Sequence, residues 1–171
     1  MNFMLLWLRS KDRRIAKPAQ GLVEFALIAP LFLMLLYGLF EVGRAVFMLS
    51  AVRNASRDAV RYAGASGTNP SGVERYRDCA GIRDRAKRVS AFVDLSAANA
   101  VAISYDKGPS TTPIAASCEA LVSSGKKLAL GDRVVVTVRA TFVPVVGPLL
   151  NFNTIPIEST SARSLVIGLD V

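Results

Sequence analysis

The longest apolar run of the chain lies near its N-terminus. Residues Gly21 to Phe40 are apolar apart from Glu24, and sixteen residues without a charge follow from Phe25 to Phe40. Together with the residues from Gly21 onward, this run reaches the roughly 20 residues that a helix needs to cross a hydrocarbon core about 30 Å thick. The pattern therefore predicts a transmembrane helix.

Helical spacing continues beyond the apolar run. An apolar residue recurs every three or four positions at Met48, Val52, Ala55, Ala59 and Tyr62. Arg53, Arg57 and Arg61 recur every four positions on another face of the same helix, which is typical of a solvated surface. The sequence predicts one long helix from about Leu22 to about Ala65, which ends at the Gly-, Ser- and Pro-containing stretch 64–72.

Pro30 lies inside the predicted span. Proline has no backbone N–H and its ring clashes with the preceding turn, so we expect a helix kink between Ala26 and Pro30. Proline is also tolerated in transmembrane helices because neighbouring groups satisfy the freed carbonyl. Both interpretations of Pro30 stay open.

The rest of the chain changes from helical to strand periodicity. Apolar residues at helical spacing predict a second helix from about Val73 to Val93. Alternating and valine-rich stretches then predict three strands, Val101–Tyr105, Arg133–Val143 and about Ile155–Val166. The connections are short, which favours antiparallel pairing. The expected fold class is α+β: a long N-terminal helix, a second helix and a small antiparallel sheet.

Charge is distributed unevenly and predicts an orientation. The chain carries a net charge of +8, and five basic residues precede Ala19 against Asp12 alone, a local charge of +4. Basic residues before a span keep that end in the cytoplasm, so we expect everything after about Glu41 to be exported. A cleaved signal peptide is the alternative, with Gly43 and Ala45 as small residues at its cut. The helical pattern beyond Phe40 favours a retained helix.

Composition argues against metal and cofactor chemistry. The chain has no histidine, so it lacks the commonest general base and metal ligand. Two cysteines, Cys79 and Cys118, are too few for a zinc site. In an exported domain we expect them to form a disulfide, which closes a loop of about 40 residues and stabilises the fold by roughly 2–4 kcal/mol. Two separate buried thiols are the alternative.

The N-terminal residues resemble a known family. The stretch from Gln20 to Pro30, QGLVEFALIAP, continues through Tyr37–Arg44 to Asn54–Ala63 and resembles the TadE-like pseudopilins of the tight-adherence (Flp-type) pilus. The resemblance implies cleavage by a prepilin peptidase on the cytoplasmic side, before an apolar stretch whose fifth residue is glutamate. Counting back from Glu24 places this cut between Ala19 and Gln20. The family usually has glycine before the cut, and a cut after Gly21 would restore it but make Glu24 the third residue.

The resemblance also gives the glutamate a role. In pilin-like assemblies the glutamate of one subunit is thought to neutralise the new α-amine of a neighbour. An ion pair in a low dielectric fixes subunit register, because an unpaired charge there is costly. A carboxylate that snorkels to the headgroups is the alternative. Glu41 and Arg44, three residues apart within the family match, are expected to pair on the outer membrane face, either as a family feature or as a local helix pair.

Three segments and one set of partners follow from this interpretation. We expect a basic cytoplasmic leader (1–19), a transmembrane and amphipathic helix (20–65) and an exported α+β domain (66–171). The chain would be a single-pass protein of the bacterial inner membrane with its C-terminal domain in the periplasm. Its partners would be the prepilin peptidase, other pilin-like subunits and the pilus assembly platform, without a small-molecule substrate or cofactor.

Three other functions compete with a pseudopilin. An uncleaved, anchored module that recruits another envelope protein needs the same helix but neither a cut nor Glu24. An enzyme is suggested only by the S-x-x-K spacing of Ser123 to Lys126 and Ser124 to Lys127, whose companion motifs are absent. Nucleic-acid binding by the arginine row is disfavoured, because acidic residues interleave with the basic ones. We expect a structural protein and not an enzyme.

Overall fold

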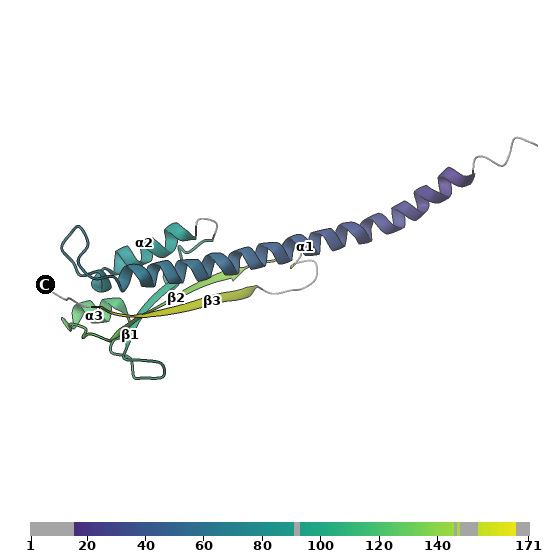
Figure 1. Ribbon diagram of the computed structural model, residues 1–171. Helices are drawn as coiled ribbons and strands as arrows, with labels where there is room; N and C mark the ends of the chain where they lie inside the picture. Colours follow the sequence, from purple (N-terminus) through teal and green to yellow (C-terminus); the bar gives the residue numbers. More distant parts are fainter. Residues whose placement is uncertain (1–15, 91–92, 146, 148–153, 167–171) are drawn as a thin grey trace, which may run out of the picture. The chain divides into compact units, whose positions relative to one another are not determined.

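The computed structural model describes residues 16–90, 93–145, 147 and 154–166, and Figure 1 shows its elements. The chain divides into two compact units, Met1–Gly43 and Arg44–Val171. The second unit begins at Arg44 because the helix beyond this point packs on the sheet. The elements are α1 (Ala16–Ala63), η1 (Arg75–Arg77), α2 (Cys79–Val89), β1 (Val101–Asp106), α3 (Cys118–Ser123), β2 (Arg133–Phe142) and β3 (Ile155–Ser164). This content confirms the predicted α+β class.

Helix α1 starts earlier than the sequence predicted. It begins at Ala16 instead of Leu22, so Pro18 lies within the first turn. Proline is tolerated there because the first N–H groups of a helix have no intrahelical partner. The helix also continues through Pro30, and the kink expected at that residue stays a prediction. Residues 1–15 of the predicted basic leader lie outside the described residues.

The sheet is antiparallel, as predicted, and its three strands lie in the order β1-β2-β3. Val136 of β2 is the partner of Ile103 on one side and of Ser161 on the other. Val134, Val136 and Val138 are fully buried on one face, as their alternation predicts. The opposite face is polar, and cross-strand ion pairs join Arg133 to Asp106 and Arg139 to Glu158.

Small side chains allow α1 to approach the sheet closely. Val52, Ala55 and Ala59 are fully buried, whereas Met48 and Tyr62 of the predicted stripe pack only partly against the core. Ser56 is also fully buried, and its hydroxyl lies 3.1 Å from that of Ser159 and 2.9 Å from that of Ser161. The sequence analysis missed Ser56. Buried hydroxyls that bond to one another avoid the cost of unsatisfied polar groups.

The second helix begins later than predicted because Asp78 caps it. The Asp78 side chain accepts a hydrogen bond from the N–H of Gly81 at 2.9 Å, so α2 starts at Cys79 and not at Val73. The same carboxylate accepts hydrogen bonds from Tyr62 at 2.7 Å and from Asn69 at 2.9 Å. Burial raises the pKa of Asp78, but these three hydrogen bonds outweigh it and hold the pKa below its ordinary value. Asp78 therefore joins α1, the connection after it and α2.

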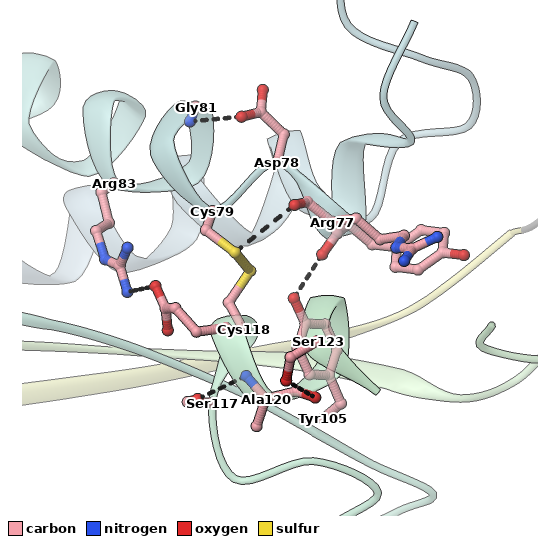
Figure 2. The surroundings of a disulfide bond; sticks show 12 residues. Arg77, Asp78, Cys79, Gly81, Arg83, Tyr105, Ser117, Cys118, Ala120 and Ser123 are labelled. Atoms are coloured by element: carbon pink, nitrogen blue, oxygen red, sulfur yellow. Dashed lines mark hydrogen bonds and ion pairs between the residues drawn. A yellow bond between two sulfur atoms is a disulfide. The ribbon is translucent and has the colours of Figure 1, made fainter. Parts of the chain in front are cut away.

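A short helix and a disulfide complete the second unit. Cys118 is the first residue of α3, a helix that was not predicted, and the N-cap Ser117 accepts a hydrogen bond from the N–H of Ala120. Cys118 is joined to Cys79 by a disulfide with a Cα–Cα distance of 5.8 Å (Figure 2). Arg83 of α2 and Glu119 of α3 form an ion pair beside it at 2.6 Å. The bridge thus ties the beginnings of two helices together.

Gly81 provides a test of this packing. A Cβ at this position would collide with the Asp78 carboxylate and lie 2.8 Å from the Tyr62 hydroxyl oxygen. Glycine to alanine in a helix ordinarily stabilises by up to about 1 kcal/mol. Here we expect Gly81→Ala to lower the free energy of unfolding by about 1–3 kcal/mol, because the side chain forces the hydrogen-bonded carboxylate aside. Chemical denaturation followed by circular dichroism measures the difference.

The control for Gly81→Ala is the same change in an Asp78→Ala background. Removing the carboxylate removes the closest contacts and releases the Tyr62 hydroxyl from its hydrogen bond, so the second substitution should then cost little or become stabilising. An equal loss of stability in both backgrounds would contradict the explanation.

Candidate functional site: the apolar part of α1

The first unit presents a large apolar surface. From Leu22 to Phe40, the large apolar side chains of α1 are between 43% and 73% exposed, with Leu36 and Leu31 at the two extremes. Soluble monomers rarely expose a continuous apolar surface of this kind. The Gln20–Ala63 part of the helix is long and apolar enough to cross a membrane. It is therefore a candidate membrane anchor.

Glu24 is the one carboxylate within this apolar surface. Its side chain is exposed, between the exposed apolar neighbours Val23 and Phe25. Gln20, one turn earlier, donates a hydrogen bond from Nε2 to Oε1 of Glu24 at 3.3 Å. The structure thus brings together the first and fifth residues of the predicted mature chain. The Gln20 amide is neutral and does not itself compensate the negative charge of Glu24.

The predicted cleavage site lies at the start of α1. Ala19 and Gln20 are both helical, and the peptide bond between them follows the first turn. The cut itself stays a prediction. A cut there would leave Gln20 as the first helical residue, with its new α-amine about 6 Å along the helix axis from Glu24.

Glu41 and Arg44 each have a contact that was not predicted. Tyr37 donates a hydrogen bond from its hydroxyl to Oε1 of Glu41 at 2.9 Å. The sequence analysis missed this bond, although the spacing of four residues was its signal. In the second unit, the Arg44 guanidinium lies 5.2 Å from the ring centroid of Phe142. The pair of Glu41 with Arg44 stays a prediction.

The S-x-x-K residues are placed in a helix end. The Ser123 hydroxyl donates to the carbonyl of Ala120 at 3.2 Å, and the Ser124 hydroxyl donates to the carbonyl of Leu121 at 2.9 Å. Lys126 and Lys127 are exposed. Both hydroxyls therefore complete the end of α3, a structural role that explains the two serines without catalysis.

The comparison with protein families gives one match. Residues 19–61, about a quarter of the chain, match the family described as TadE-like protein. The match confirms the resemblance over the segment that holds Glu24, Pro30 and the arginine row. A TadE-like segment implies a protein associated with the Tad pilus. No curated protein and no solved structure matches the chain.

Membrane burial of this surface is testable by thiol labelling. Both cysteines of the chain are in the disulfide, so an introduced cysteine is the only free thiol. We expect Leu33→Cys in native membranes to react with a charged maleimide at least about tenfold more slowly than the exposed Arg88→Cys, because the hydrocarbon around Leu33 excludes the charged reagent. Detergent should remove the difference. Equal labelling of both variants in membranes opened by freeze–thaw would rule out a membrane position for Leu33.

Proposed function

Because the chain carries a TadE-like segment, we propose that it is a membrane-inserted pseudopilin-like subunit that acts in assembly of a Tad (Flp-type) pilus. The observation that carries the proposal is the family match at residues 19–61, which coincides with an exposed apolar helix surface holding a single carboxylate. Such a surface requires lipid or other apolar helices around it. Other pilin-like subunits and the assembly platform supply such helices.

The proposed mechanism starts with removal of the basic leader. A prepilin peptidase cuts between Ala19 and Gln20 and releases the α-amine of Gln20. Glu24 of one subunit then neutralises the amine of its neighbour within the apolar layer. The hydrogen bond from Gln20 to Glu24 shows that position 20 lies on the same side of the helix as Glu24. A pair within one chain therefore competes with the proposed pair between subunits.

The proposed location is the bacterial inner membrane with the second unit on the periplasmic side. The basic residues before Ala19 support a cytoplasmic N-terminus. The disulfide between Cys79 and Cys118 supports an oxidising compartment for the second unit, since structural disulfides rarely persist in the cytosol.

An uncleaved recruitment module is the second candidate function. It uses α1 as an anchor and the second unit as a binding surface, and it assigns no role to Glu24. The family match over residues 19–61, which includes Glu24, favours the pseudopilin. Both candidates are structural proteins without a cofactor.

The experiment that separates them is removal of the Glu24 charge. We expect Glu24→Gln to enter the membrane at the normal level but to reduce surface pili at least about tenfold, because the amine of the neighbour is left without a partner in a low dielectric. Pili are counted by electron microscopy of a strain that carries the variant. Asp94→Asn, which removes an exposed charge of the second unit and keeps an oxygen that accepts the hydrogen bond from the N–H of Ser96, should leave the count unchanged. A normal pilus count with Glu24→Gln would favour the recruitment module.

A further inference from the structure

One edge of the sheet is open for pairing. In the described part of the chain β3 pairs with β2 alone, so its other edge has no partner strand. Alternate residues of an antiparallel strand bond to opposite neighbours. Arg139 donates its N–H to Ala100 beside β1, and Leu165 donates its N–H to Asp132 on the β3 side. Odd-numbered residues of β2 therefore bond to β1, and even-numbered ones bond to β3.

The register then identifies the backbone groups at the open edge. Even-numbered β2 residues pair with odd-numbered β3 residues, such as Val136 with Ser161. The even-numbered residues of β3 consequently direct their N–H and C=O groups away from the sheet. Pro156 belongs to this set, and a proline is tolerated there because no ladder bond needs its N–H. Beyond it, the outward groups belong to Glu158, Thr160, Ala162 and Ser164.

A row of arginines lies beside this edge. Ser56 of α1 contacts Ser159 and Ser161 of β3, and a Cβ at Gly64 would lie 2.9 Å from Cδ of Arg163. Helix α1 and strand β3 therefore run side by side in the same direction (Figure 1). Tyr62 lies on the side of α1 that faces Asp78 before α2. At about 100° per residue, Arg53 and Arg57 lie on the opposite side of Ser56, beside the open edge of β3.

The arginine row is accessible and carries positive charge. Arg53, Arg57 and Arg61 are all exposed. Within the described ranges none of the three forms an ion pair with a carboxylate of this chain, although Asp58 is adjacent in sequence. The row therefore differs from the arginines of the outer sheet face, where Arg133 and Arg139 are paired.

The spacing of the row matches an extended chain. Residues four apart in a helix are about 6 Å apart along its axis. Side chains on one face of a strand recur every two residues, at about 6.6 Å. Over three arginines the axial mismatch is about 1 Å, which a long arginine side chain absorbs. Positions four apart also turn by about 40°, so Arg53 and Arg57 lie nearest the edge and Arg61 lies about 80° around α1 from Arg53. A strand added to β3 would present every second side chain toward α1.

We propose that the open edge of β3 and the arginine row of α1 together bind an extended segment of a partner protein that carries a carboxylate at every second residue. The backbone groups of β3 pair with the segment, and the row selects its charge. The proposal concerns the second unit alone, so it does not depend on the role of Glu24 or on leader cleavage.

A designed peptide tests the proposal with the full chain in a non-ionic detergent. The probe is a fluorescein-labelled peptide of about nine residues in which glutamate and valine alternate, and binding is read by anisotropy. Two controls match it: glutamine in place of glutamate, and the same composition with the glutamates grouped at one end. We expect both controls to bind at least about tenfold more weakly. Equal binding of the alternating and grouped peptides, or no binding by the alternating one, would overturn the proposal.

Two variants separate the two parts of the surface. Arg57→Glu should weaken binding of the alternating peptide at least about tenfold, whereas Arg88→Glu, the same charge change on exposed α2, should leave it within about twofold. Ala162→Pro removes one outward N–H without touching the β2–β3 ladder, so it should weaken binding as well. Ala162→Val, which keeps that N–H, should bind normally. The proposal would be overturned in favour of a nucleic-acid surface by two results together: Ala162→Pro binds the alternating peptide normally, and duplex DNA of equal charge binds as tightly as the peptide.

Hydrogen exchange gives a test that needs no variant. In the unbound chain the N–H groups of Thr160 and Ala162 should exchange rapidly, whereas those of Ser159 and Ser161 should be protected by the ladder with β2. Binding of the alternating peptide should slow hydrogen exchange at the N–H groups of Thr160 and Ala162 at least about tenfold. Unchanged exchange at saturating peptide would place the peptide elsewhere, and protection without peptide that rises with protein concentration would assign the edge to a second copy of this chain. Either result would overturn the proposal.

Discussion

The second unit depends on the close approach of α1 to the sheet. The sheet has one apolar face, and its valines must be covered by helices. The covering side chains of α1 are small: Ala55, Ser56 and Ala59 are all fully buried. Small residues on the helix and serines on β3 let the two backbones approach, and the hydroxyl contacts of Ser56 hold the register. A larger residue at any of these positions would push the helix away from β3.

The N-terminal part of α1 has a different surface, which suits lipid. Before Arg44 the apolar residues surround the helix, whereas from Met48 onward they form one stripe. Apolar residues all round are stable in lipid, and a one-sided stripe is stable against a sheet. The change in pattern within one continuous element explains why a boundary between compact units falls inside α1 and not at its end.

Most of the architecture could be predicted from the sequence. The valines of β2 alternate clearly, so the strand and its buried face followed from periodicity, whereas antiparallel pairing followed from the connections. The start of α2 could not be predicted in this way. Val73 and Tyr76 have helical spacing, but they precede Asp78, the N-cap residue at which α2 begins. The three hydrogen bonds of that carboxylate come from residues up to 16 positions away, and local pattern does not report them. Helix α3 was missed because six residues are too few for a periodic signal.

The candidate site was predicted differently. Length and apolarity alone indicated the membrane helix, and the family resemblance alone distinguished Glu24 from an ordinary carboxylate at a membrane edge. The structure adds the hydrogen bond between Gln20 and Glu24, and it places the predicted cut at the first turn of α1. The arginine row was interpreted as a solvated face, and only its position beside the open edge of β3 suggests a further role.

The most direct test of the account is the N-terminus of the protein isolated from native membranes, determined by intact mass and N-terminal sequencing. The account predicts a chain that starts at Gln20, with Glu24 as its fifth residue. A chain that starts at Met1 would contradict it, because an uncleaved protein has no new amine for Glu24 to neutralise. The apolar part of α1 would then be an anchor alone.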